Sequence, residues 1–412
     1  QTGETSPRQR VSAAAQHDLT YYRKQLADPQ QGPPIRQYLH DRGISDEMIQ
    51  RFQIGYAPDR WDALSRAAQN TRDWDVKGFE QAGLIQARQS GGYYDRLRHR
   101  VVFPICDSLG RPIAFGGRRV REEDEPKYLN TPETELFNKS ATLYGLDQAK
   151  KPIIDSGTAV IVEGYTDVIA CHQAGASNVV ATLGTALTHD HVKHLRRFAE
   201  KVVLIFDPDE AGQKAADRAV EIFLTGDVDV AIATLPEGLD PADMLAQAGG
   251  LDRWQETVEG AQDALAYQFG RISSELAAAT TVTGRQHVAE RYIEQLGRLG
   301  LGKATPALRR SFVIQRLSQL LHMSEQQVNE LLNKSVQRAR PKQARHPESS
   351  AGEAGESDPG THVSDDPAPT GRERARALAE RQLIGGLIRS NDLFHHTLPD
   401  GSGLDEGVLP DE

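Results

Sequence analysis

The sequence predicts an α/β protein built on a doubly wound parallel sheet, with a mixed α/β region before it and a helical region after it. From Thr158 onward, β-branched apolar runs alternate with stretches of helical spacing. This alternation is typical of parallel strands joined by helices. Residues 17–155 mix short helices with two strands that flank the turn DSLGRP, and residues 250–338 show helical periodicity throughout.

The elements follow from these patterns in chain order. Helical spacing of Leu19, Tyr22 and Leu26 predicts a first helix, and a second is expected around 35–39. Short strands are expected at 101–105 and 112–116. The predicted parallel strands are 159–162, 178–181, 202–206 and 228–233, with helices at 166–174, 188–200 and 210–224.

Changes in composition divide the chain into six parts. Residues 339–372 are rich in Pro, Gly, Ser, Asp and Glu, a composition that indicates a flexible linker. The expected parts are a disordered polar tail (1–16), a basic mixed α/β subdomain (17–155), the sheet domain (158–245), a helical bundle (250–338), the linker (339–372) and a terminal segment (373–412).

Composition limits the functional classes. The 412 residues suggest about two to four domains. No apolar run approaches the roughly 18 residues of a membrane span, so we expect no membrane partner. Cys106 and Cys171 form neither a disulfide framework nor a Cys-rich zinc site, which favours a reducing cytoplasm. The net charge of −10 hides a basic patch, because the segment from Arg88 to Arg121 contains eight arginines and only two aspartates.

Acidic residues follow the ends of three predicted strands. Glu163 follows the first, Asp207 and Asp209 follow the third, and Asp240 and Asp243 follow the fourth. Ligands of open α/β sheets bind at this edge, and gathered carboxylates would raise one another's pKa without a cation. Mg²⁺ prefers such oxygen ligands, and two ions about 4 Å apart support phosphoryl transfer. Asp-Pro-Asp before a helix is equally typical of a turn with an N-cap.

The basic segment offers side chains that suit a polyanion. Arg96, Arg98 and Arg100 alternate, so an extended segment would place them on one side. FGGRR offers a backbone that a ligand could approach closely, and PKYLNTPET follows it. Together they supply phosphate- and base-binding candidates in Arg96, Arg98, Arg118, Lys127, Tyr128 and Asn130. A solvated basic face is the alternative interpretation of the arginines.

Both segments resemble known families. VEGYTDVIACHQAG, ATLGTALT, VVLIFDPDEAG and LPEGLDPAD are similar, in order and spacing, to a Toprim domain, a unit also found in topoisomerases, nucleases and recombination mediators. RGISDEMIQRFQIGYAPDRWDAL, YDRLRHRVVFPICDSLGRPIAFGGR and PKYLNTPETELFNKSATLYGL resemble the polymerase core of the bacterial DNA primase family. The resemblance covers about residues 18–335, and ERQLIGGLI is similar to the start of the family's helicase-binding domain.

The resemblance implies residue roles. Glu163, Asp207 and Asp209 would be catalytic and would bind Mg²⁺ or Mn²⁺, with Asp240 supporting the metals. Asp243 is shifted by one residue from the Asp-Pro-Asp of many relatives. Glu163 could act as general base for the attacking 3′-hydroxyl, or the metal could activate it unaided. Arg96, Arg98, Arg118 and Lys127 would contact phosphates, and the nucleotide site would include Tyr128, Asn130 and Lys139.

The resemblance also implies a function. It implies a monomeric, cytoplasmic DNA-directed RNA polymerase that writes short primers from ribonucleoside triphosphates on single-stranded DNA at the replication fork. Residues 373–412 would contact the replicative helicase. Zinc is expected only in the family's N-terminal ribbon, whose cysteines are missing here, so we expect a fragment. A Toprim nuclease and a non-catalytic nucleic-acid scaffold remain alternatives. A topoisomerase is less expected, because little chain remains for a strand-passage domain with a nucleophilic tyrosine.

Overall fold

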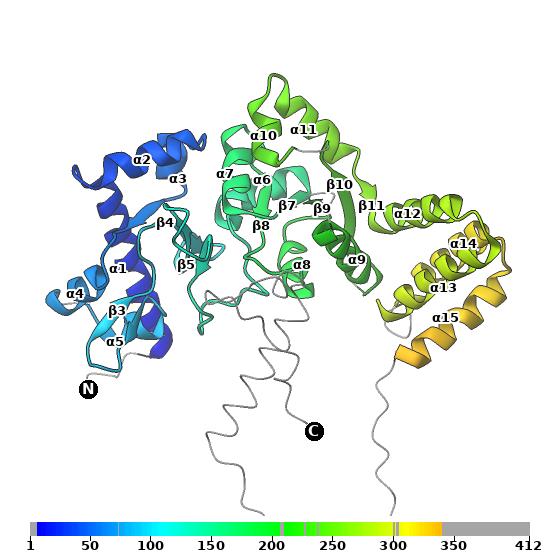
Figure 1. Ribbon diagram of the computed structural model, residues 1–412, viewed down its shortest axis with the longest axis horizontal. Coiled ribbons are helices and arrows are strands. Elements are labelled where there is room, and N and C mark those ends of the chain that lie inside the picture. The colour runs from blue at the N-terminus through cyan, green and yellow to red at the C-terminus, as the bar shows by residue number, and fades with distance from the viewer. Residues whose placement is uncertain are drawn as a thin grey trace, which may run out of the picture. The chain divides into compact units, whose positions relative to one another are not determined.

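Two larger sheets and one two-stranded hairpin organise the described part of the chain (Figure 1). The structure is a computed structural model, and it describes residues 6–72, 74–206, 210–225, 228–236, 239–299, 301 and 305–339. Within these ranges, no helix combines the length and the apolar character that crossing a membrane requires.

The first sheet is antiparallel, with the strand order β1-β4-β5-β6. Val101, Phe103 and Ile105 of β4 face one apolar core while Val102 faces another, which is the period of two that a strand covered on both faces shows. The strands predicted at 101–105 and 112–116 are confirmed, and the second continues to Arg119. The bounds are β1 Gly55–Ala57, β4 Arg100–Cys106, β5 Pro112–Arg119 and β6 Tyr128–Asn130, and the hairpin is β2 Ile85–Ala87 with β3 Tyr93–Asp95.

Five helices accompany this sheet: α1 Pro7–Ala27, α2 Gly32–Asp41, α3 Asp46–Arg51, α4 Ala63–Asn70 and α5 Val76–Gln81. The predicted disordered tail over residues 1–16 is wrong from Ser6 onward, because α1 begins at Pro7. A capping box between Ser6 and Gln9 starts the helix, and Val11 and Ala15 are buried against the sheet. The apolar residues at the start of α1 are small, so the sequence pattern gave only a weak indication of a helix there.

The second sheet has the order β11-β10-β9-β7-β8. Four of its strands, β10, β9, β7 and β8, are parallel and match the four predicted ones, and β7 lies beside β9 as expected. The bounds are β7 Thr158–Val162, β8 Val179–Ala181, β9 Lys201–Phe206, β10 Asp229–Thr234 and β11 Gln262–Asp263.

The prediction of an all-parallel sheet is wrong at one edge. β11 pairs antiparallel with β10, inside a region that we expected to be wholly helical. Two residues carry no strand periodicity, so the sequence gives no signal for this pairing. Asp263 then caps the next helix, because its carboxylate accepts from the backbone N–H groups of Leu265 and Ala266.

Helices cover both faces of the second sheet. Ala159 and Ile161 of β7 belong to one core, and Val160 and Val162 belong to the other, so the strand is buried on both sides. The helix predicted at 188–200 ends earlier, at Leu195, where the N–H groups of Phe198 and Ala199 turn back to the Leu195 carbonyl. The bounds are α6 Leu146–Ser156, α7 Tyr165–Gln173, α8 His189–Leu195, α9 Glu210–Thr225, α10 Pro241–Ala246 and α11 Gly250–Glu259.

Four further helices, drawn in yellow-green to orange in Figure 1, follow β11. Val313 and Leu317 of α14 and Val328 and Leu332 of α15 join the core that begins on the α9 side of the second sheet. These helices are α12 Ala264–Ala278, α13 Val282–Arg298, α14 Ala307–Leu321 and α15 Glu325–Ala339. The predicted linker 339–372, apart from Ala339 at the end of α15, and the terminal segment 373–412 lie outside the described residues.

One apolar core joins the two larger sheets. Phe103 of β4 stacks on Tyr165 of α7, with ring centroids 5.3 Å apart and planes 2° apart. Tyr144 meets the same tyrosine edge-on at 4.7 Å. The core therefore holds the carboxyl edge of the second sheet against the strands β5 and β6.

Candidate active site

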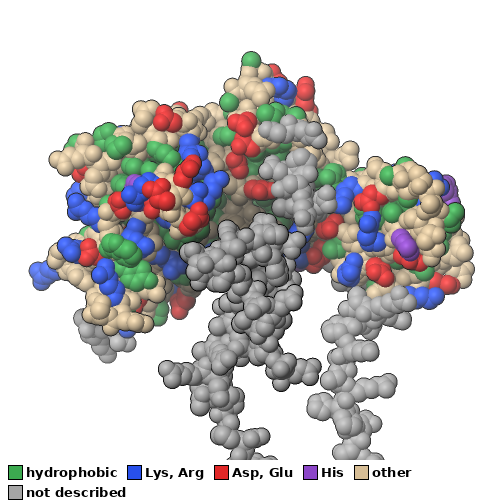
Figure 2. Space-filling model, in the orientation of Figure 1, with side chains coloured by type: hydrophobic (Ala, Val, Ile, Leu, Met, Phe, Trp, Pro, Cys, Tyr) green, Lys and Arg blue, Asp and Glu red, His purple; other side chains and the backbone are tan. Residues whose placement is uncertain are grey.

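A cleft of about 1020 Å³ lies at the carboxyl edge of the second sheet. Its lining brings together three predicted acids, Glu163, Asp240 and Asp243, with two predicted bases, Arg118 and Lys127. Figure 2 shows both basic (blue) and acidic (red) side chains on the left side of the hollow and acidic side chains on the other side. Carboxylates and positively charged side chains thus share one space.

Glu163 occupies the turn between β7 and α7 and is exposed to the cleft. The next residue, Gly164, is the N-cap of α7, and its backbone N–H donates to the Asp167 carboxylate at 3.0 Å. A Cβ at Gly164 would lie 2.9 Å from that carboxylate oxygen, so the glycine permits the tight turn. The Glu-Gly pair therefore places an acid at the strand end, while the carboxylate of Asp167 caps the start of the helix.

The other two catalytic candidates follow β9. In the register of β7 and β9, Ile161 lies opposite Leu204, and β9 ends at Phe206. Asp207 and Asp209 come directly after it but lie outside the described residues, so their approach to Glu163 stays a prediction.

The described residues include no group of three or more His, Cys, Asp or Glu side chains that could hold a metal. The acids that do line the cleft are Asp41, Glu163, Asp167, Asp240 and Asp243. All offer only carboxylate oxygens, the donor type that Mg²⁺ and Mn²⁺ accept. The donor chemistry therefore fits a hard divalent cation.

Asp240 has a structural task as well as a place in the cleft. It is the N-cap of α10, and its Oδ1 accepts from the backbone N–H of Asp243 at 2.7 Å. Pro241 occupies the first helical position, where no N–H is needed. The turn-and-cap interpretation, which we considered for Asp207–Asp209, thus describes this acid, and its exposed carboxylate still faces the cleft.

Tyr165 and Asn130 link the acidic edge to the basic wall. The Tyr165 hydroxyl donates to Asn130 Oδ1 at 2.7 Å, and Asn130 Nδ2 donates to the Leu183 carbonyl at 3.1 Å. Burial raises the pKa of Tyr165, although the bond to Asn130 opposes that effect, so the phenol stays protonated. Both ends of the Asn130 amide are thus engaged by the protein, which makes this nucleotide-site candidate part of the wall's framework.

Gly116 explains part of the motif FGGRR. A Cβ at Gly116 would lie 2.5 Å from the Tyr165 hydroxyl oxygen, and one at Gly117 would lie 2.9 Å from the Leu97 side chain. We expected these glycines to admit a ligand. The close neighbours are protein side chains instead, because β5 packs directly against α7 and against Leu97.

Arg118 presents its guanidinium in the cleft from the end of β5. Its Nε donates to the Tyr38 hydroxyl at 3.3 Å, and its Nη1 donates to the Tyr128 hydroxyl. The residue is only 9% exposed, so its orientation is fixed by packing as well as by these bonds. Lys127 lies beside it, with Nζ 5.9 Å from the Tyr128 ring centroid.

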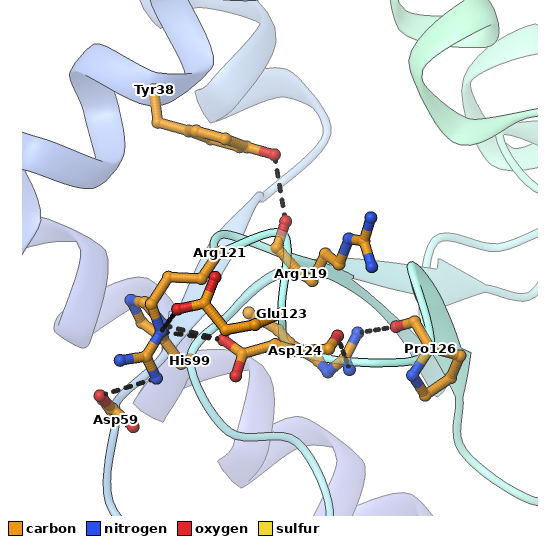
Figure 3. Close-up of polar contacts among 9 residues, drawn as sticks. Tyr38, Asp59, His99, Arg119, Arg121, Glu123, Asp124 and Pro126 are labelled. Atoms are coloured by element: carbon orange, nitrogen blue, oxygen red, sulfur yellow. Dashed lines mark hydrogen bonds and ion pairs between the residues drawn. The ribbon is translucent and has the colours of Figure 1, made fainter. Parts of the chain in front are cut away.

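The loop between β5 and β6 carries Lys127 and is held by a polar network (Figure 3). The buried Arg100 guanidinium donates to the carbonyls of Asp124 at 3.0 Å and Pro126 at 2.7 Å. Arg121 pairs with Asp124 at 3.2 Å. Burial would raise the pKa of Asp124, but the bonds from Arg121 and His99 outweigh it and lower that pKa.

The expectation that Arg96, Arg98 and Arg100 lie on one side of an extended segment is wrong. His99 has a φ of 47°, which interrupts the extended chain, and β4 begins only at Arg100. Arg98 stacks on the exposed Trp61, with its Cζ 4.2 Å from the ring centroid, whereas Arg100 is buried under the loop. Neither Arg96 nor Arg98 is among the described residues that line the cleft.

Lys139 also lies outside the cleft lining among the described residues. Its backbone N–H donates to Glu133 at 2.9 Å, and its carbonyl meets His191 Nε2 at 2.8 Å. These two hydrogen bonds both use the backbone of Lys139, and the role of its side chain as a nucleotide contact stays a prediction.

Two family profiles match consecutive parts of the chain: the N-terminal domain of the DNA primase catalytic core at residues 21–150, and a Toprim-like domain at residues 160–245. A DNA primase of Synechocystis sp. is 35% identical over 404 residues, which are 92% of this chain and 60% of that protein. The chain thus spans less than two thirds of that relative's length.

Solved structures agree with these profiles. A DNA primase domain from Pseudomonas aeruginosa is 35% identical, with a TM-score of 0.69, over 78% of this chain and 99% of that one. The chain belongs to the bacterial DNA primase family. A primase catalytic domain solved with single-stranded DNA is 32% identical, with a TM-score of 0.66, over 78% of this chain and 99% of that one.

Sequence reasoning missed Arg42 and Asp167, which line the primase cleft, and Tyr38, which holds a lining residue. Tyr38 and Arg42 come from α2 and its C-terminus, and the Arg42 Cζ lies 4.7 Å from the Tyr38 ring centroid. Asp167 of EGYTD is the third omission. The cap pattern of EGYTD could have indicated Asp167. Nothing local indicated Tyr38, because its partners lie about 80 residues away.

Proposed function

We propose that this chain is the catalytic core of a DNA primase, a nucleotidyltransferase that joins ribonucleotides into short RNA primers on single-stranded DNA. The cleft is the observation that supports the proposal. Carboxylates at the sheet edge form one of its walls, and Arg118 and Lys127 lie on the opposite wall. A polyanionic triphosphate needs both: oxygen ligands for its cations and positive side chains for its phosphates.

In the proposed reaction, the 3′-hydroxyl of the growing primer attacks the α-phosphate of an incoming nucleotide. A new phosphodiester bond forms, and pyrophosphate leaves. Glu163, Asp207 and Asp209 hold Mg²⁺ or Mn²⁺, and Asp240 supports them. When bound, the metal lowers the pKa of the attacking hydroxyl and offsets the charge of the leaving phosphates. Glu163 is the candidate that accepts the hydroxyl proton, and Arg118 and Lys127 hold the phosphates.

The template is proposed to pass over a second surface. Arg98 stacks on Trp61 and lies 5.8 Å from the Tyr94 ring centroid, and Trp61 is 64% exposed. An exposed aromatic ring backed by a guanidinium suits stacking on bases that lack a partner strand. A primase catalytic domain solved with single-stranded DNA supports this substrate class.

The proposed setting follows from the family. The full protein acts as a monomer in the cytoplasm at the replication fork, and the region 373–412 contacts the replicative helicase. Zinc belongs to a separate N-terminal module, and a solved Aquifex aeolicus primase contains a zinc-binding domain together with its RNA polymerase domain.

Primer synthesis tests the proposal. Glu163→Gln and Asp207→Ala should each lower incorporation of labelled nucleotides about 100-fold or more, because even outer-shell partners of a metal are worth about 10- to 100-fold. Glu259→Gln makes the same chemical change on α11, outside the cleft lining, and should leave synthesis unaltered. Circular dichroism should be the same for all variants.

Three results would contradict the proposal. Failure of the wild-type chain to incorporate nucleotides, when it is supplied with template and helicase, would remove its basis. Release of nucleotides from DNA without any triphosphate would favour a Toprim nuclease. Normal DNA binding with no metal-dependent chemistry would favour a scaffold.

A further inference from the structure

Arg118 differs from the neighbouring arginines in the kind of partner it has. Arg111 pairs with Asp107 at 2.6 Å, Arg119 pairs with Glu125, and Arg121 pairs with Asp59 at 3.0 Å. Among the described residues, no acidic side chain forms an ion pair with Arg118. The oxygens that hold it belong to neutral phenols, and such bonds orient a guanidinium without cancelling its charge.

The Tyr38 hydroxyl can serve Arg118 only as an acceptor. Its hydrogen is donated to the Arg119 backbone carbonyl at 3.1 Å (Figure 3). A hydroxyl has one hydrogen and two lone pairs, so a lone pair is left for Arg118 Nε at 3.3 Å. The strand that carries Arg118 thus also fixes the acceptor that aims it.

The ring of Tyr38 is held independently of its hydroxyl. Arg42 lies over the ring face at 4.7 Å, and Tyr38 packs against the core shared by the two sheets. Phenylalanine at this position would keep both ring contacts. It would lose the hydroxyl alone, which is the acceptor that faces Arg118 and the donor to the Arg119 carbonyl.

We propose that Tyr38 is a positioning residue, which aims the Arg118 guanidinium at a phosphate group in the cleft. The inference rests on the proposed function for the identity of its substrate, a ribonucleoside triphosphate. Two nitrogens of Arg118 are tied to Tyr38 and Tyr128, which leaves Nη2 and the second hydrogen of Nη1 for the ligand. A guanidinium fixed in this way loses little rotamer freedom when the phosphate arrives.

The test compares Tyr38→Phe with the wild type in the full 412-residue chain. Removing one bond to a charged group should raise the KM for the nucleotide about tenfold and leave kcat within about twofold. The dissociation constant of a labelled, non-hydrolysable ribonucleoside triphosphate, measured at equilibrium, should rise by the same factor. Tyr267→Phe, another half-buried tyrosine, on α12, should change neither value.

A double variant separates aiming from folding. In an Arg118→Lys background, Tyr38→Phe should have less than about a twofold effect, because lysine has no Nε to be aimed. Affinity for single-stranded oligothymidylate at fixed salt tells nucleotide phosphate from template phosphate, and it should not change. Equal effects in both backgrounds, an unchanged nucleotide affinity, or a loss confined to oligothymidylate would overturn the inference.

The inference and the proposed function fail in different ways. If the wild-type chain bound the nucleotide but made no primer, the proposed function would fail while the binding comparison still tested Tyr38. If the chain made primers and Tyr38→Phe bound nucleotide normally, the inference would fail alone. Thermal unfolding of each variant within about 2 °C of the wild type would exclude a folding effect.

Discussion

Replacing Gly116 with alanine should displace the side chain of Tyr165. The new Cβ would lie 2.5 Å from the tyrosine hydroxyl oxygen and 2.6 Å from Cζ. The ring cannot retreat easily, because it is 6% exposed and stacks on Phe103 at 5.3 Å. Overpacking of this kind costs about 1–3 kcal/mol, and loss of the bond to Asn130 adds about 1 kcal/mol. We expect Gly116→Ala to lower the free energy of unfolding by about 2–4 kcal/mol.

Urea unfolding followed by circular dichroism measures this change. Gly270→Ala is the control, because Gly270 is exposed within α12 with open space around it, so it should stabilise the chain by about 0.5–1 kcal/mol. In a Tyr165→Leu background, Gly116→Ala should cost less than about 1 kcal/mol, since the ring that it strikes is gone. A wild-type stability for Gly116→Ala, or an equal loss in both backgrounds, would refute the steric argument.

Three further outcomes are expected. Burial, and secondarily the nearby Arg51, lowers the pKa of His172 from 6.5 to about 4, although its bond to the Val179 carbonyl opposes them. The unfolded chain therefore takes up that proton first, stability falls as pH drops from 6.5 to 4, and unfolding curves of His172→Gln should lack this part of the slope. Arg100→Lys should loosen the loop that carries Lys127 and raise the nucleotide KM severalfold in primer assays. Chelation with EDTA should abolish primer synthesis without changing the circular dichroism spectrum, and added Mg²⁺ should restore it.

The parallel sheet was predictable because its strands are long apolar runs between helices. The neighbouring position of β7 and β9 followed from common sheet topology, and it determines which acids can meet. The place of Glu163 in the cleft was predictable because the acid stands directly at the end of a strand. These features depend on residues close together in the chain, which is where sequence patterns are informative.

Features that depend on distant contacts were not predictable. The alternation of arginines suggested an extended segment, but the left-handed conformation of His99 depends on its tertiary surroundings. The glycines of FGGRR suggested an open backbone, but Tyr165 fills the space next to Gly116. The helix over residues 7–16 lacked large apolar residues and is stabilised by its cap and by packing. No local pattern joins Tyr38 to Arg118.

The ring stack of Phe103 on Tyr165 has a mechanical consequence. The edge that carries the acids and the wall that carries Arg118 and Lys127 are separate stretches of chain, yet they pack on the same apolar core. The distance between the two sides of the cleft is consequently fixed by the packing of this core, when the chain folds and before a substrate binds. Heating should release both sides together, in a single melting step.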